Sequence, residues 1–284
     1  MYRHLATQEE IDREYNPRLG VPDVDALIAA WAERSARTRQ RLGGRIGSRY
    51  GPTLAEHVDV FPATNDRAPV HVFLHGGYWR AFSSTDFSFV AESALARGHA
   101  AVIVNYALCP AVTITEIVRQ ARAAVAWVWN NATSFGGDRE RITLSGHSAG
   151  GHLAARVIAA RWQRDYGIAD DAVKGVVAIS GLFDLEPLRW SWLQPTLQLS
   201  GDEILAQSPI RHLPPARVPV VAAVGGHESA EFRRQSREYA AALETRHGGA
   251  EYLEVAGRHH FDVLDDLADP DGVLWRRVEA LAGA

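Results

Sequence analysis

A serine stands between two glycines at residues 146–150, in the order Gly-His-Ser-Ala-Gly. A short apolar run precedes this segment at 142–145, and a helical pattern follows it at 151–158. Glycines on both sides of a serine permit a sharp turn from strand to helix, because they lack the Cβ atoms that would collide there. The turn exposes the serine oxygen at a helix N-terminus, where unpaired backbone amides favour negative charge. We therefore predict that Ser148 is a nucleophile.

A serine hydroxyl is a weak nucleophile at neutral pH, so it needs a general base and a third group that orients the base. Where a turn of this kind carries the serine, an acid and then a histidine follow it along the chain. Glu228 follows the predicted strand 218–224 and is our predicted acid. Asp184 follows the preceding predicted strand and is the alternative acid.

The base is expected after the predicted strand 252–255, where two histidines, His259 and His260, are adjacent. A histidine at this place follows the acid in the chain, as the order of the three groups requires. Serine, acid and histidine together would form a catalytic triad.

A hydrolase of this type must also stabilise the oxyanion of its tetrahedral intermediate. The predicted strand 70–74 runs through His75 into two glycines, whose backbone amides can point at a substrate oxygen. We expect the amides of Gly76, Gly77 and Ala149 to form the oxyanion hole.

Large side chains and further histidines flank these segments. Tyr78 and Trp79 follow the two glycines and are expected to contact the substrate, forming a small acyl pocket that suits formyl or acetyl groups. His75 is expected to brace the loop. His147 and His152 lie beside the serine, but their spacing matches no zinc signature, so we expect no bound metal.

Runs rich in β-branched residues alternate with helix-length segments, of which 117–129 has the plainest helical pattern. This alternation predicts an α/β fold, with a mainly parallel central sheet and helices on both faces. The predicted strands are 57–61, 70–74, 101–105, 142–145, 176–180, 218–224 and 252–255.

Two segments lie outside this alternation. We interpret residues 1–55 as an N-terminal helical extension, with a helix at 24–41 that packs on the sheet or over the site. Residues 182–217 are irregular and rich in proline and tryptophan, so we predict a lid or substrate wall there. The whole chain, 1–284, is expected to form one domain.

The composition excludes several classes of function. The 284 residues are 46% hydrophobic and 23% charged, and the formal net charge of -4 supplies no basic field for nucleic acid. A single cysteine, Cys109, excludes an internal disulfide and fits a reducing compartment. Residues 1–10 lack the apolar core of a signal peptide, and no apolar run is long enough for a bilayer. We expect a cytoplasmic protein that acts on a small molecule and binds neither nucleic acid nor membrane.

Taken together, these residues resemble the kynurenine formamidase (arylformamidase) branch of the α/β-hydrolases. The resemblance implies the α/β-hydrolase fold and the triad Ser148, Glu228 and His260, although the acid of the animal enzymes is an aspartate. It favours His260 over His259, because in related hydrolases the histidine leads directly into the apolar residue that begins the last helix. The segments that carry the resemblance are 14–18, 75–79, 146–152, 227–232 and 260–262.

Tyr78 and His147 separate this branch from a neighbouring one. Esterases of the hormone-sensitive-lipase type usually have a third glycine where Tyr78 stands, and an acidic residue where His147 stands. The resemblance implies a cofactor-free serine hydrolase that removes a formyl group from an arylamine such as N-formyl-L-kynurenine, and a homodimer as its assembly. The alternatives are a carboxylesterase of small esters with the same triad, and a non-enzymatic scaffold of the same fold.

Overall fold

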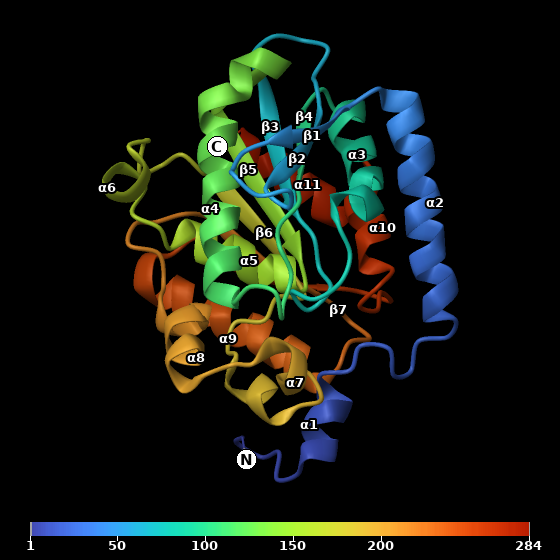
Figure 1. Ribbon diagram of the computed structural model, residues 1–284, viewed down its shortest axis with the longest axis vertical. Helices are drawn as coiled ribbons and strands as arrows, with labels where there is room; N and C mark the ends of the chain where they lie inside the picture. Colours follow the sequence, from blue (N-terminus) through green and yellow to red (C-terminus); the bar gives the residue numbers. More distant parts are fainter. Residues whose placement is uncertain (1, 284) are drawn as a thin grey trace.

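An eight-stranded sheet runs through the centre of the computed structural model, which describes residues 2–283 (Figure 1). Its strand order is β1-β2-β4-β3-β5-β6-β7-β8. The strands from β3 to β8 pair in parallel, whereas β2 is antiparallel to both β1 and β4. The strands are β1 (Arg45–Arg49), β2 (His57–Phe61), β3 (Ala68–Leu74), β4 (Ala100–Val104), β5 (Gly137–His147), β6 (Gly175–Ile179), β7 (Val220–Gly225) and β8 (Ala250–Val255).

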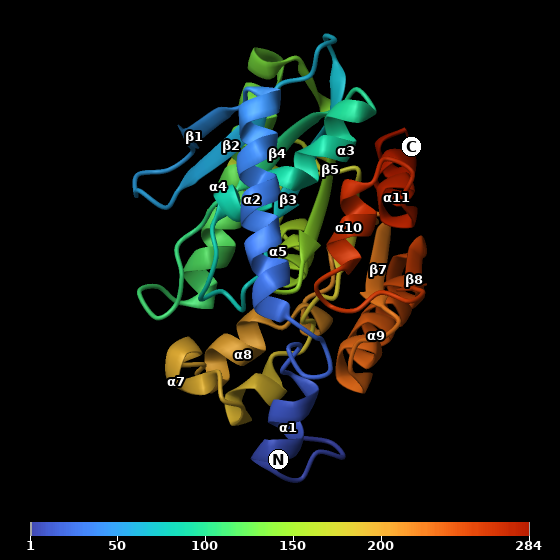
Figure 2. The ribbon, with the colours of Figure 1, turned by 90° about the vertical axis from the view of Figure 1, so that its right-hand side faces the viewer.

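Helices cover both faces of the sheet (Figures 1 and 2). One face carries α4 (Ile114–Asn131), α5 (Ala149–Ile158) and α9 (Ala230–His247). The other carries α2 (Val24–Leu42), α3 (Ala91–Ala96), α10 (Val263–Ala268) and α11 (Val273–Ala282). The fold is therefore the three-layer α/β arrangement that the alternation of strands and helices predicts.

The two helical layers pack on alternate residues of the same strands. In β3, Val70, Val72 and Leu74 belong to the core under α4 and α5, whereas Phe73 belongs to the core under α2 and α3. All four are buried, so both faces of the strand are covered, although His71 interrupts its apolar sequence.

Short helices and turns gather at one end of the sheet, where Figure 1 shows α1, α7 and α8. The backbone N–H of Trp192 donates to Asp12 of α1 at 2.7 Å, so the predicted wall 182–217 contacts the N-terminal segment. The remaining short elements are α1 (Gln8–Glu14), η1 (Ser84–Val90), η2 (Ala132–Phe135), α6 (Trp162–Tyr166), η3 (Glu186–Trp190), α7 (Gln194–Leu197), α8 (Gly201–Gln207) and η4 (Pro209–Arg211).

All seven predicted strands are present, as is the helix predicted at 24–41. The N-terminal extension 1–55 holds α1 and α2, and it also contains the edge strand β1, which is not among the predicted strands. Four of the five β1 residues are exposed, and Gly47 has a φ of +74°. An exposed edge strand with a glycine has no alternation of apolar and polar residues to reveal it. Within residues 2–283 no helix combines the length and apolar character needed to cross a bilayer.

Candidate active site

Ser148 lies at the turn between β5 and α5, with φ 56° and ψ -117°. A serine held at positive φ stores backbone strain, which persists only where the surrounding structure enforces it. Close packing around the two glycines holds the turn in this conformation. A Cβ at Gly146 would collide with the carbonyl of Gly150, and a Cβ at Gly150 would collide with the carbonyl of Leu74. The Ser148 N–H also donates to the Ile179 carbonyl at 2.8 Å. The geometry is that of the predicted sharp turn from strand to helix around the serine, a nucleophile elbow.

His260 and Glu228 are brought together from separate loops. Nδ1 of His260 lies 2.6 Å from Oε2 of Glu228, and both side chains are buried. Oε1 of the same carboxylate accepts hydrogen bonds from the Gly225 N–H at 2.8 Å and from the Ser180 hydroxyl. A carboxylate held on both oxygens can fix the ring orientation of the histidine, and it holds the proton on Nδ1 so that Nε2 is free to accept one.

Sequence reasoning gave Ser180 no role, although it ends a predicted strand. Its hydroxyl orients the Glu228 carboxylate, and its own φ of 51° is another positive value at a non-glycine residue. The only signal in the sequence is its place at the end of the strand beside β7, where side chains of parallel neighbours converge.

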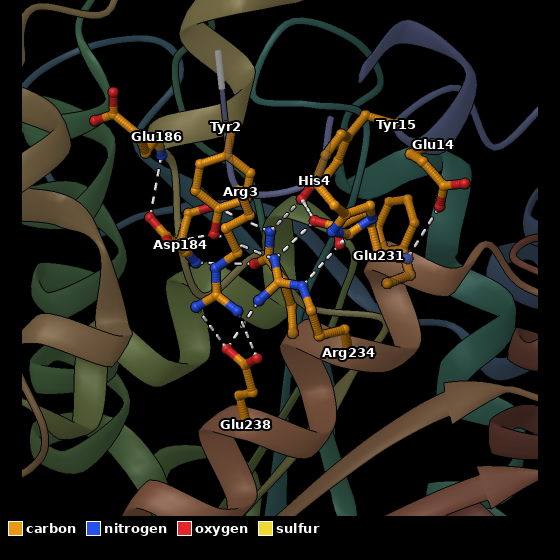
Figure 3. Close-up of polar contacts among 12 residues, drawn as sticks. Tyr2, Arg3, His4, Glu14, Tyr15, Asp184, Glu186, Glu231, Arg234 and Glu238 are labelled. Atoms are coloured by element: carbon orange, nitrogen blue, oxygen red, sulfur yellow. Dashed lines mark hydrogen bonds and ion pairs between the residues drawn. The ribbon is translucent and has the colours of Figure 1, made fainter. Parts of the chain in front are cut away.

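The alternative acid, Asp184, and the alternative base, His259, form their hydrogen bonds with other residues. Asp184 accepts a hydrogen bond from the Tyr2 hydroxyl at 2.7 Å, and Figure 3 shows it beside Tyr2. His259 caps a local turn, where its Nδ1 accepts from the N–H groups of Phe261 and Asp262 at 3.1 and 3.2 Å. Neither makes a hydrogen bond to the Glu228–His260 pair within residues 2–283.

Two histidines near Ser148 form hydrogen bonds to neighbouring backbone carbonyls and are not members of the expected triad. Nε2–H of His147 donates to the backbone carbonyl of His260 at 2.8 Å, which fixes the backbone of the expected base. Burial holds the pKa of His147 well below its ordinary value, and the nearby His260 lowers it further, so the ring stays neutral. His152 instead donates to the Gln207 carbonyl at 2.8 Å, and burial lowers its pKa to about 3. The two rings therefore form hydrogen bonds to different segments of the chain.

The predicted oxyanion loop packs against the elbow. A Cβ at Gly76 would lie 3.3 Å from that of Ser148, and Gly77 has a φ of +105°. Among the loop contacts of residues 2–283, neither Gly76 nor Gly77 uses its N–H in a backbone hydrogen bond. His75 braces this loop through its Nδ1–H, which donates to the Gly76 carbonyl at 2.8 Å, and its ring stacks on Tyr106 with centroids 4.1 Å apart.

Tyr78 and Trp79 point to different places, although both have positive φ. Tyr78 lines the cavity that contains Ser148, and its hydroxyl donates to the Tyr15 carbonyl at 2.6 Å. Trp79 is fully buried, packs against His152 and is not among the cavity-lining residues. The expectation that Trp79 contacts the substrate is therefore corrected: successive left-handed residues turn its indole into the core.

Ser148 and His260 line one cavity of about 150 Å³. Neither Ser148 Oγ nor His260 Nε2 has a hydrogen-bond partner within residues 2–283, so both atoms are free to meet a substrate. The N-terminal segment, α2 and the predicted wall all contribute to the lining, through Asn16, Trp31 and Trp192. The helical pattern at 24–41 predicts that Trp31 lies on a helix, but it does not show whether the side chain lines a cavity or packs in the core.

The BD-FAE family profile matches residues 58–243, more than half of the chain. Over 290 aligned residues the chain is 30% identical to the kynurenine formamidase of Salmo salar, with 97% of each protein covered. The kynurenine formamidase of Danio rerio is 28% identical, over 98% of this chain and 97% of its own. The chain belongs to the kynurenine formamidase branch of the α/β-hydrolases.

Other hydrolases of this fold are similar to the chain. A solved structure of a candidate thioesterase from Silicibacter sp. is 32% identical, with a TM-score of 0.83 over 97% of this chain and 99% of its own. The esterase LipQ of Mycobacterium tuberculosis is 28% identical over 83% of this chain and 64% of LipQ. This α/β-hydrolase thus has relatives named for the hydrolysis of amides and of esters.

Proposed function

We propose that the protein is a serine hydrolase that removes a small acyl group, most concretely formyl, from an arylamide such as N-formyl-L-kynurenine. The observation that carries the proposal is the buried Glu228–His260 pair, 2.6 Å apart, whose histidine lines one cavity with the strained Ser148. The full-length similarity to two proteins named kynurenine formamidase supports the formyl substrate.

The first half of the reaction forms an acyl-enzyme. Ser148 Oγ attacks the formyl carbonyl carbon while His260 Nε2 takes the hydroxyl proton. The carbonyl oxygen becomes an oxyanion that accepts hydrogen bonds from the Gly76, Gly77 and Ala149 amides. When the C–N bond breaks, the proton on His260 passes to the arylamine nitrogen, and the formyl group stays on Ser148 as an ester.

The second half releases formate. A water molecule gives a proton to His260 Nε2 and attacks the formyl ester, and a second oxyanion forms at the same amides. Its collapse breaks the bond to Oγ, which recovers a proton from His260. The Glu228 carboxylate stabilises the imidazolium in both halves. Base and oxyanion donors are all protein groups, so the proposed route needs no cofactor.

A carboxylesterase of small esters is the second candidate, because the same triad cleaves esters and LipQ bears the name esterase. The test is a comparison of turnover on the purified protein, with N-formyl-L-kynurenine against short-chain nitrophenyl esters. Formamidase activity predicts a clearly higher kcat/KM for the formamide. A preference for the esters would assign the second candidate, and turnover of neither would contradict both.

A further inference from the structure

The cavity around Ser148 has a charge opposite to that of the chain. Two arginines, Arg18 and Arg80, contribute to its lining, and no aspartate or glutamate does so among the described residues. The chain as a whole carries a formal net charge of -4. A cleft with cationic lining on an acidic protein concentrates anionic ligands.

The two arginines differ in whether a carboxylate of the protein already pairs with the guanidinium. Arg18 is paired with Asp25 at 2.5 Å, and both side chains are exposed. The guanidinium of Arg80 makes no hydrogen bond or ion pair within residues 2–283. Arg80 therefore has hydrogen-bond donors to offer a ligand.

Arg80 is nevertheless held in place. Its guanidinium carbon lies 5.1 Å from the centroid of the Trp192 ring, and that ring contacts Tyr78 edge to face at 6.1 Å. Stacking on an aromatic face uses the flat side of a guanidinium and leaves its N–H edge free for a planar anion such as carboxylate. Because its orientation is fixed before binding, less conformational entropy is lost when a carboxylate binds.

The two ends of the cavity differ in their exposure to solvent. Ser148 is 2% exposed at its inner end, whereas Arg80 is an exposed residue at its outer end. The lining also contains a cluster of aromatic rings: Trp31 lies 6.4 Å from Phe82 and 5.9 Å from Phe261, measured between ring centroids. A ligand that matches this lining has a reacting carbonyl for Ser148, an aromatic ring and an anion for Arg80.

We propose that Arg80 is a specificity-determining residue: its guanidinium binds the carboxylate of substrates that, like N-formyl-L-kynurenine, are acylated aromatic amines with an anionic tail. The inference rests on the proposed function, since it assigns the inner end of the cavity to acyl transfer. Neutral aryl formamides and simple esters lack the anion and would bind more weakly.

The experiment uses two substrates that differ only in charge: ortho-formamidophenylpropanoate and its primary carboxamide. Wild type is compared with Arg80→Gln and Arg80→Lys. Arg189→Gln is the matched control, because Arg189 stacks on the exposed Trp190 at 5.4 Å but does not line the cavity. Binding of both compounds to Ser148→Ala, measured by calorimetry, provides a readout that does not depend on turnover.

We expect wild type to favour the carboxylate at least tenfold in kcat/KM, mainly through KM, because a charge-assisted hydrogen bond contributes a factor of about ten or more. Arg80→Gln should abolish this preference, because it should lower kcat/KM for the carboxylate far more than for the carboxamide. Arg80→Lys should retain part of it, and Arg189→Gln should retain all of it.

Equal use of both compounds by wild type, or an equal loss on both in Arg80→Gln, would overturn the inference and leave the proposed function standing. If wild type hydrolyses neither formamide, the proposed function fails. Calorimetry then decides the inference: tighter binding of the carboxylate that disappears in Ser148→Ala/Arg80→Gln supports it, and equal binding overturns it.

Discussion

The hydroxyl of Tyr78 donates a hydrogen bond to the backbone carbonyl of Tyr15 across 2.6 Å, and thereby ties the glycine loop to the N-terminal segment. Tyr15 in turn donates its own hydroxyl to Glu231 of α9 at 2.6 Å, as Figure 3 shows. The Tyr15 ring contacts Phe232, whose ring lies 4.8 Å from that of His260. One residue thus contacts both the loop of the expected oxyanion donors and the neighbours of the expected base.

Tyr78→Phe should lower kcat about tenfold with little change in KM. Burial raises the pKa of Tyr78, so its hydroxyl stays protonated and donates; without this bond the strained loop is free to relax and its amides leave their positions. Steady-state kinetics on N-formyl-L-kynurenine measures the effect. Tyr239→Phe is the control, because Tyr239 is a buried tyrosine whose hydroxyl has no partner within residues 2–283. A rise in KM with an unchanged kcat would show that Tyr78 contacts the substrate and does not support the loop.

Ser148→Ala should abolish hydrolysis, because no other group would carry the acyl chain. Loss of a triad nucleophile lowers turnover on the order of a millionfold in a well-studied serine protease. Labelling by a fluorophosphonate, followed by mass spectrometry, should mark Ser148 in the wild type and leave the variant unmarked. Retention of a tenth of the wild-type activity would reject Ser148 as the nucleophile.

Glu228→Gln should reduce kcat by about a thousandfold or more while KM changes little, because an amide at this place stabilises the wrong tautomer of His260. Asp184→Asn is the matched control: it removes a carboxylate charge that bonds Tyr2 and not the histidine. Kinetics of both variants, with circular dichroism to verify folding, makes the comparison. The reverse ranking would transfer the acid role to Asp184.

Folding stability should decrease as the pH falls from about 6.5 towards 4. Burial lowers the pKa of His71 to about 3, of His75 to about 4 and of His152 to about 3, whereas an unfolded histidine titrates near 6.5. The unfolded chain therefore binds more protons in this window, and each histidine costs up to about 1.4 kcal/mol per pH unit. Urea unfolding between pH 7.5 and 4.5 measures the slope.

His71→Gln provides the check on this cause, since His71 is buried and bonds Ser145 instead of the site. It should flatten the pH dependence even if it lowers stability at neutral pH. An unchanged slope in this variant would show that other groups are responsible.

Chelators should leave the activity unchanged, because the proposed base, nucleophile and oxyanion donors are all supplied by the chain. The measurement is turnover before and after prolonged incubation with EDTA and gel filtration. Loss of activity that zinc or manganese restores would point to metal-activated water and contradict the serine mechanism.

The elements that position the site could be predicted because they follow strong local patterns. Strand β5 and helix α5 flank the Gly-x-Ser-x-Gly turn, and the glycines at 146 and 150 leave no room for side chains. The choice between Glu228 and Asp184 could not be made from the residues alone. Both follow neighbouring parallel strands, and only the direction of each side chain, set by its loop, shows which one contacts His260.

Other features depend on backbone conformations that a sequence does not reveal. Tyr78 and Trp79 are adjacent aromatic residues, yet one lines the cavity and the other is in the core, because both adopt positive φ. Arg80 is one of many arginines until the fold places it beside Trp192, which is more than a hundred residues away in the sequence. Such long-range neighbours are products of the tertiary structure.

The contacts of the N-terminal segment also bear on how the protein is made. Tyr15 and Glu231 are 216 residues apart, and Arg3 and Glu238 are 235 apart, so the ribosome exposes one partner long before the other exists. At a synthesis rate of about 5–20 residues per second, the first segment waits roughly 10–40 s for α9. During that interval the glycine loop lacks the brace that joins it to the expected base, so a nascent chain acquires its proposed hydrolytic centre only after α9 and His260 have been synthesised.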